Sequence, residues 1–118
     1  MDRSSERVTV FVFGSNLAGR HGKGAARTAM RQYGAEYGIG WGPTGNAYAI
    51  PTKNRQLRPL SLTEIAGWVG NFLAYARNNP TVTFQVTKIG CGLAGYAEKQ
   101  IAPLFKNAPS NCELPERW

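Results

Sequence analysis

Two glycine-rich segments, residues 14–24 and 90–95, contain residue types that could bind a phosphate group through the main chain. Glycine has no Cβ, so the backbone can approach a phosphate closely, and free amide N–H groups at a helix start bind anions without a side chain. Each segment follows a predicted strand and precedes a predicted helix. The expected chemistry is therefore the binding of an anion, in particular a diphosphate.

Neither segment alone identifies a ligand. Residues 90–95 have the spacing G-x-G-x-x-G, but a dinucleotide-binding Rossmann unit needs a long βαβ continuation, for which the chain ends too soon. Residues 14–24 resemble a P-loop in their glycine spacing, yet Arg20 and His21 stand where a P-loop has Lys and Ser or Thr. We therefore expect neither a dehydrogenase nor ATP hydrolysis. Tight turns without any ligand explain residues 90–95 equally well when that segment is taken by itself.

The charge distribution favours an anionic ligand. The formal net charge is +7 at pH 7, and residues 1–58 hold nine Lys or Arg against three Asp or Glu. Such a field attracts polyanions, whether a nucleotide diphosphate or a nucleic-acid backbone, and does not choose between them. For any single one of these residues, a solvated surface position that keeps the protein soluble is an equally good explanation.

The strands that must position these loops follow from the hydrophobic pattern. Residues 8–13 are β-branched and aromatic, which predicts a strand covered on both faces and ended by the Gly-Ser-Asn that follows. Residues 47–50 predict a second strand, closed by Pro51. Residues 82–89 alternate between apolar and polar and predict a third, and residues 111–114 predict an edge strand.

Three helices are expected between these strands. Residues 26–33 place apolar side chains at helical spacing before a glycine, and the glycine-rich residues 34–46 predict a loop. A second helix begins at Ser61, which has a capping-box glutamate three residues later, and ends at residues 78–80. Residues 98–107 predict a final helix, in which a proline lies in the first turns or causes a kink.

This order of elements implies a largely parallel sheet with helices on both faces. We expect an α/β fold, namely a three-layer α/β/α arrangement with a short, largely parallel mixed sheet, formed by residues 1–118 as a single domain. Ligands of such sheets lie at the carboxyl ends of the strands, at a switch point. Both glycine-rich loops fall there, so they could converge on one pyrophosphate.

Several short motifs occur in a familiar order. They are Asn16 followed by His-Gly-Lys-Gly-Ala-Ala at 21–26, Ile-Pro-Thr-Lys at 50–53, Ile-Gly-Cys-Gly-Leu-Ala-Gly-Tyr at 89–96, and Ile-Ala-Pro-Leu at 101–104. Together they resemble macro domains, in particular the branch of the DNA-ADP-ribosyl glycohydrolase antitoxins and the human terminal ADP-ribose glycohydrolase. The resemblance covers most of residues 8–105. It implies a macro-like fold that binds ADP-ribose or a related nucleotide.

The resemblance also assigns roles to residues. It places Asn16 beside the distal ribose and Lys53 at the lysine that the antitoxin-like branch uses in catalysis, and such a lysine could act electrostatically or attack the anomeric carbon. The human relative has an acid where Ala94 stands here, and the two leading strands of the family, with their acidic adenine-contacting residue, are missing. The implied ligand-binding residues are Ser15, Asn16, Gly22, Lys23, Gly24, Gly90, Cys91, Gly92, Leu93, Ala94, Gly95 and Tyr96.

Single residues also have ordinary structural explanations. Asn16 could simply turn the backbone after a strand, as Asn commonly does. Lys23 and Lys53 each fit a solvated surface lysine. His21, the only histidine, fits a surface or ligand-adjacent position better than a general base. Cys91 fits a small structural residue.

Aromatic residues and composition set further limits. Trp41 and Tyr96 could stack on a base or cover the core, whereas the helix that begins at Ser61 buries Trp68 and Phe72. Two cysteines and one histidine cannot complete a typical four-ligand zinc site, so we expect free thiols, no metal and no cofactor. No apolar run could span a bilayer, and residues 1–7 lack the apolar segment of a secretory signal. We expect a cytoplasmic protein without membrane contact, and an oligomer is compatible with its small size.

Three functions are open on this basis. The first is hydrolysis of an ADP-ribosyl bond, on a nucleobase or a protein acidic side chain, supported by Lys53 and Asn16. The second is a non-catalytic binding module or sponge for a nucleotide signal, which Ala94 favours. The third is a nucleic-acid binder driven by the basic N-terminal half. The expected partner is an ADP-ribose-like nucleotide, either free or attached to nucleic acid or protein.

Overall fold

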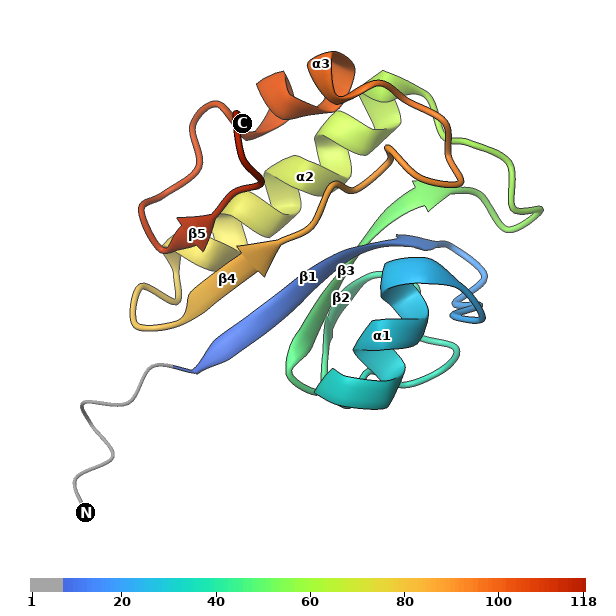
Figure 1. The fold of residues 1–118 in the computed structure, drawn as a ribbon, viewed down its shortest axis with the longest axis horizontal. Coiled ribbons are helices and arrows are strands. Elements are labelled where there is room, and N and C mark those ends of the chain that lie inside the picture. Colours follow the sequence, from blue (N-terminus) through green and yellow to red (C-terminus); the bar gives the residue numbers. More distant parts are fainter. Residues whose placement is uncertain (1–7) are drawn as a thin grey trace.

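The computed structural model describes residues 8–118, so the N-terminal segment in which no secretory signal is predicted lies outside the described residues. A five-stranded sheet forms the middle of three layers, with helices on both faces (Figure 1). The predicted α/β class and layered architecture are therefore confirmed. The elements in chain order are β1 (Thr9–Asn16), α1 (Gly24–Tyr33), β2 (Gly42–Thr44), β3 (Ala47–Lys53), α2 (Leu62–Arg77), β4 (Thr83–Val86), α3 (Glu98–Ile101), the 3-10 helix η2 (Ala102–Phe105) and β5 (Cys112–Glu113).

The sheet is largely parallel, with strand order β2-β3-β1-β4-β5. Strand β1 pairs in parallel with β3 and with β4, and β5 extends the sheet in parallel beyond β4. Among the strands of residues 8–118, only β2 runs antiparallel, against β3. Because β1 lies at the centre with a helix layer on each side, its continuous apolar run is the pattern expected of a strand buried on both faces.

The two faces of β1 bury different side chains. Phe11 and Phe13 belong to one core cluster with Ala29 of α1. Val12 points to the other side, where it belongs to a larger cluster with Phe72 of α2. Successive side chains of a strand point to opposite faces of the sheet. The core is therefore divided into two halves, one under each helix layer.

The connections create a switch point at β1. Helix α1 joins β1 to β3 on one side, and α2 then carries the chain from β3 to β4 on the other side of β1. All three strands are parallel, so their carboxyl ends lie at the same edge of the sheet. Loops that leave neighbouring strands at such a point diverge and leave a crevice for a ligand.

Two strands are longer than the sequence predicts. Strand β1 continues past residue 13 to Asn16, and β3 continues through Pro51 to Lys53. Gly14 and Pro51 predict an end to these strands, because glycine weakens a strand and proline cannot donate to the hydrogen bonds between strands. The parallel pairing continues nonetheless, with Gly14 opposite Ile50. The extension brings Asn16 and Lys53 into the sheet.

Two further expectations need correction. Residues 42–44, predicted as loop, form strand β2, which is too short to be recognised and exists through pairing with β3. Residues 98–107 do not form one helix, since a single turn of α-helix is followed by a 3-10 turn with Pro103 at its start. Proline has no N–H to donate to the preceding turn, which explains the break. The predicted capping box of α2 and the edge strand near residue 112 are confirmed.

Candidate ligand-binding site

A pocket of about 940 Å³ opens at the carboxyl ends of β1, β3 and β4. Residues from both glycine-rich loops line it, so these loops lie on one side of the molecule and share one cavity. Its lining residues are Gly14, Ser15, Asn16, Arg20, Gly22, Lys23, Gly24, Ala25, Ala26, Tyr37, Thr52, Lys53, Leu57, Thr87, Lys88, Ile89, Gly90, Cys91, Gly92, Leu93, Ala94 and Glu98. Of the twelve ligand-binding residues that the sequence resemblance implies, only Gly95 and Tyr96 do not line the pocket.

Asn16 and Lys53 are neighbours at the strand ends. They are paired across the β1–β3 ladder, after an irregularity in the register between Ser15 and Asn16. The N–H of Leu17 donates to the carbonyl of Lys53 at 3.0 Å, and the hydroxyl of Thr52 donates to the carbonyl of Ser15 at 3.2 Å. The sheet itself therefore holds together the two residues that the sequence motifs assign to chemistry.

The side chain of Asn16 also holds the following turn. Its Nδ2 donates to the carbonyl of Arg20 at 2.8 Å, and its Oδ1 accepts from the N–H of Arg20 at 3.0 Å. These bonds are the backbone-turning role that Asn commonly has after a strand. An amide side chain has two donor protons and two acceptor lone pairs, so one of each is left for a ligand.

The first loop packs against the segment that follows α1. The buried hydroxyl of Ser15 donates to the carbonyl of Gly40, and the N–H of Gly38 donates to the carbonyl of Gly19 at 2.8 Å. A Cβ on Gly19 would overlap the backbone of Gly38, and a Cβ on Gly40 would overlap the carbonyl of Asn16. These glycines are required for close backbone packing, which builds one wall of the pocket.

His21 is buried and does not occupy the surface position that the sequence allowed, although its chain neighbours Arg20 and Gly22 line the pocket. Its side chain is 0% exposed, and its Nε2 lies 2.8 Å from the carbonyl of Ile39. A carbonyl only accepts, so Nε2 carries the proton. Its ring contacts the rings of Phe13 and Tyr37 edge to face. A histidine in a polar glycine-rich loop carries no sequence signal of this burial, because the packing of residues 36–41 over the loop creates it.

Backbone N–H groups without a partner belong to residues that line the pocket on two sides. Within residues 8–118, the N–H groups of Gly92, Leu93 and Ala94 donate to no other group, although all three residues line the cavity. Helix α1 begins at the same cavity, and its N-cap residue Lys23 makes no side-chain cap hydrogen bond. The first N–H groups of a helix have no intrahelical acceptor. Both sets can therefore bind an anion.

The glycine-rich loop after β4 is closed by its own backbone. The N–H of Gly95 donates to the carbonyl of Gly92 at 3.0 Å, and that of Tyr96 donates to the carbonyl of Gly90 at 2.9 Å. The hydroxyl of Tyr96 donates to the carbonyl of Leu60 at 2.6 Å, and its ring packs against the core. Gly95 and Tyr96 thus shape the loop from outside the pocket.

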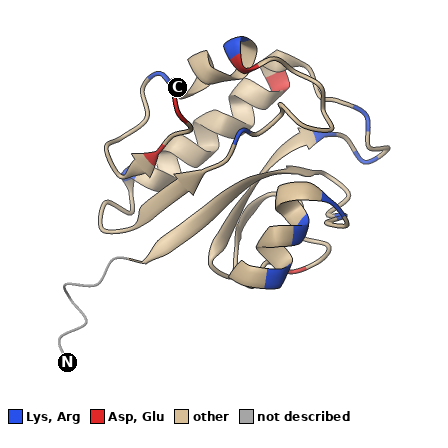
Figure 2. Cartoon of the chain, in the orientation of Figure 1, with Lys and Arg blue, Asp and Glu red and all other residues tan. Residues whose placement is uncertain are grey.

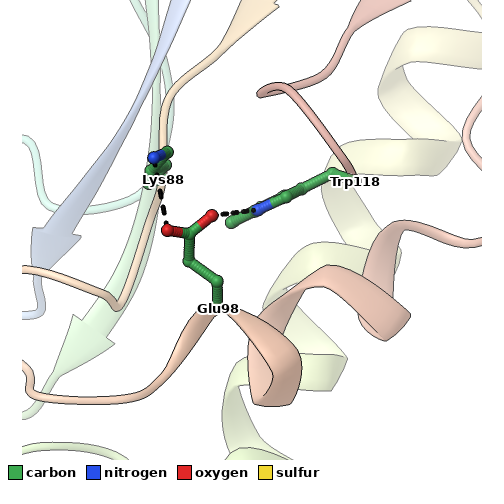
Figure 3. A network of polar contacts seen from close by, with 3 residues as sticks. All are labelled: Lys88, Glu98 and Trp118. Atoms are coloured by element: carbon green, nitrogen blue, oxygen red, sulfur yellow. Dashed lines mark hydrogen bonds and ion pairs between the residues drawn. The ribbon is translucent and has the colours of Figure 1, made fainter.

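Among residues 8–118, four cationic residues line the pocket, namely Arg20, Lys23, Lys53 and Lys88, against the single carboxylate of Glu98. Figure 2 shows basic residues along α1 and in the loop that follows β3. Both carboxylate oxygens of Glu98 already have partners. Oε1 accepts a hydrogen bond from Trp118 Nε1 at 3.0 Å, and Oε2 lies 3.2 Å from Lys88 Nζ (Figure 3). The hydrogen bond from Trp118, followed by that from Lys88, lowers the pKa of Glu98. The excess of positive charge suits an anionic ligand.

The two cysteines are free thiols with raised pKa values. Burial, followed by the nearby charge of Glu98, raises the pKa of Cys91, and Lys88 opposes this shift. Burial raises the pKa of Cys112 to about 11. Both thiols are therefore protonated and weakly nucleophilic near neutral pH. Cys91 therefore contributes to the pocket wall as a neutral thiol.

The aromatic residues divide between core, surface and pocket. Phe72 is fully buried, as predicted. Trp68 is only half-buried, with its ring 5.9 Å from that of the exposed Trp41. Neither tryptophan lines the pocket, and Tyr37 is the one aromatic residue of the described chain that does. Tyr37, Lys88 and Glu98 line the pocket but were not predicted from the sequence. Lys88 and Glu98 flank the glycine-rich loop at residues 90–95, so their positions in the chain could have identified them. Tyr37 has no such signal.

Within residues 8–118, no three His, Cys, Asp or Glu side chains are grouped so that they could hold a metal ion. Over the same range, no helix is long and apolar enough to cross a membrane.

Comparison with known proteins gives two significant structural neighbours. No protein-family model matches the chain, and no curated protein matches it significantly. The fold is similar to the macrodomain of Mycobacterium tuberculosis DarG, with a TM-score of 0.63 and 20% identity over 90% of this chain and 86% of that one. A protein of unknown function from Bacteroides thetaiotaomicron also has a TM-score of 0.63, with 16% identity over 86% and 80% of the two chains. The chain therefore has the fold of a macrodomain.

Proposed function

We propose that the pocket binds ADP-ribose or a close relative. The observation that carries this proposal is the convergence of two sets of unpaired N–H groups, from Gly92–Ala94 and from the start of α1, on one cavity. Backbone amides arranged in this way bind phosphate oxygens. The macrodomain fold and the sequence resemblance to ADP-ribose-binding macro domains both favour a pyrophosphate as the anion.

In the proposed complex, the pyrophosphate and the distal ribose occupy different parts of the pocket. The pyrophosphate lies between the loop at Gly92–Ala94 and the N-terminus of α1, with Arg20 and Lys23 in the surrounding wall. The distal ribose lies at the ends of β1 and β3, where Asn16 offers its remaining donor and acceptor. This orientation brings the anomeric carbon next to Lys53.

We further propose that the protein hydrolyses an ADP-ribosyl bond at this carbon. Water adds to the anomeric carbon as the bond to the leaving group breaks, and the leaving group departs with the electron pair and a proton. The ammonium group of Lys53 stabilises the negative charge that develops on the leaving group. The leaving group is a nucleobase or the carboxylate of a protein side chain.

Lys53→Ala tests the catalytic part of the proposal. The variant should lose at least about 100-fold in the release of ADP-ribose from an ADP-ribosylated oligonucleotide or peptide, because one charge-stabilising group typically contributes that much. Its affinity for ADP-ribose by calorimetry should stay within about threefold, since the N–H groups remain. Lys106→Ala changes an exposed lysine outside the pocket and should leave both values unchanged. Equal turnover by Lys53→Ala would end the catalytic assignment.

Titration with ADP-ribose, ADP, NAD and AMP tests the binding part. ADP-ribose and ADP should bind more tightly than AMP, which lacks the pyrophosphate. If none of the four ligands bound, or if AMP bound as tightly as ADP, the pocket would not be a pyrophosphate site.

A non-catalytic module is the second candidate function. The loop at 90–95 carries Ala94 instead of an acid. Glu98 is the only carboxylate that lines the pocket in the described part of the chain, and its two oxygens already contact Lys88 and Trp118. Incubation of an ADP-ribosylated substrate with excess protein, followed by heat release, separates the two functions. Recovery of the unchanged substrate supports sequestration, and recovery of free ADP-ribose excludes it.

A further inference from the structure

Tyr37 is an exposed aromatic side chain in a pocket wall. It lies between α1 and β2, its side chain is 63% exposed, and it is the only aromatic residue among residues 8–118 that lines the cavity. The other large rings of the chain mainly fill the core, as Phe13 and Phe72 do. A ring that could have been buried is instead presented to the space where a ligand would lie.

The position of Tyr37 is fixed by its neighbours. The N–H of Gly38 donates to the carbonyl of Gly19 at 2.8 Å, and His21 Nε2 binds the carbonyl of Ile39 at 2.8 Å. The buried ring of His21 meets the ring of Tyr37 at a centroid distance of 6.0 Å and an interplanar angle of 73°. The backbone on the C-terminal side of Tyr37 is thus tied to the first glycine-rich loop, so little freedom is lost when a ligand contacts the ring.

A fixed, solvent-exposed ring beside a diphosphate site suits a planar partner. Every nucleobase has a π-face, and stacking of a base on an aromatic side chain contributes to binding without hydrogen bonds that would select one base. A tyrosine ring combines a large contact area with few rotatable bonds. No aliphatic residue of the wall offers a comparable flat surface.

We propose that Tyr37 is the surface on which a nucleobase of the ligand stacks. The inference rests on the proposed function, because it takes the pyrophosphate as held by the glycine-rich loops. Two bases have the required chemistry, namely the adenine of ADP-ribose and a base joined to the anomeric carbon of the distal ribose. Both would stack in the same way, and ligands that differ in these bases distinguish them.

The test compares Tyr37→Ala, Tyr37→Phe and a matched control, Trp41→Ala. Trp41 lies in the same segment and is similarly exposed, at 60%, but it does not line the pocket. Affinities are measured by calorimetry for ADP, ADP-ribose and NADH, which carries a neutral planar ring on the distal ribose, and for inorganic pyrophosphate, which has no base. Tyr37→Ala should bind the base-bearing ligands about tenfold more weakly, Tyr37→Phe within about twofold of wild type, and Trp41→Ala as wild type does.

The pattern of losses identifies the base. Weaker binding of ADP and ADP-ribose by Tyr37→Ala assigns the ring to adenine, and weaker binding of NADH alone assigns it to the base on the distal ribose. Equal affinity of Tyr37→Ala and wild type for every base-bearing ligand that wild type binds overturns the inference. An equal loss for pyrophosphate also overturns it, since the loop would then have moved. If wild type binds none of the ligands, the proposed function itself fails, which is a separate result.

Discussion

At the scale of single residues, the glycines of this chain have two different purposes. Gly40 is required for packing, because a Cβ there would overlap the carbonyl of Asn16. Gly22 and Gly92 face open space, where a Cβ would meet nothing within 4 Å, and both line the pocket. The first kind lets two loops touch, whereas the second leaves room for a ligand.

Gly40→Ala should therefore destabilise the fold by about 1–3 kcal/mol, the usual cost of inserting a methyl group into a packed site. Gly22→Ala is the matched control and should leave the free energy of unfolding within about 0.5 kcal/mol of wild type. Urea unfolding followed by tryptophan fluorescence measures both values. Similar midpoints for the two variants would contradict the assignment of Gly40 to packing.

At the scale of elements, α2 is the best example of a structure that its own sequence specifies. The hydroxyl of Ser61 accepts from the N–H of Glu64 at 3.1 Å, and the Glu64 carboxylate accepts from the N–H of Ser61 at 3.1 Å. These local bonds satisfy N–H groups that a helix start otherwise leaves unpaired. The boundary of this helix could therefore be predicted from four consecutive residues.

Ser61→Ala should lower the free energy of unfolding by about 1 kcal/mol, the typical value of an N-cap. Thr63→Ala changes an exposed hydroxyl in the same turn that takes no part in the cap and serves as the control. Thermal unfolding measured by circular dichroism should show a lower Tm for Ser61→Ala alone. The same Tm for both variants would show that the cap contributes nothing.

At the scale of the whole molecule, three distant segments meet at Glu98. The carboxylate at the start of α3 binds Lys88, which follows β4, and the indole of the last residue, Trp118 (Figure 3). The ring of Trp118 also lies 5.5 Å from that of Phe105 in η2. The end of the chain is thus joined to a residue that lines the pocket.

This contact predicts a pH dependence of stability. The pKa of Glu98 is lower in the folded chain than its ordinary value of 4.5. The contribution of the carboxylate is therefore present above the unfolded pKa and is lost as the pH falls through the folded pKa. Between pH 7 and pH 3, wild type should lose more stability than Glu98→Gln does. The indole hydrogen bond is the largest cause of the lowered pKa. Trp118→Phe should therefore remove most of the difference in pH dependence between wild type and Glu98→Gln. Parallel curves of the free energy of unfolding against pH for wild type and Glu98→Gln would contradict this prediction.

Part of the fold and of the site could be predicted from the sequence alone. The apolar run before Gly14 indicated a strand with two covered faces, and the glycines after two strands indicated loops at the same edge of the sheet. These signals are local, since periodicity, caps and glycine spacing depend on residues close in the chain. They determined the α/β class, the main elements and the segments that form the pocket.

Other features depended on the tertiary structure. The burial of His21, the pairing of Asn16 with Lys53, and the presentation of Tyr37 in the pocket wall all come from contacts between segments far apart in the sequence. No local pattern encodes such contacts, because each partner is an ordinary loop or strand residue by itself. The sequence thus determined which backbone segments could bind an anion, and only the packing of the loops decided which side chains surround it.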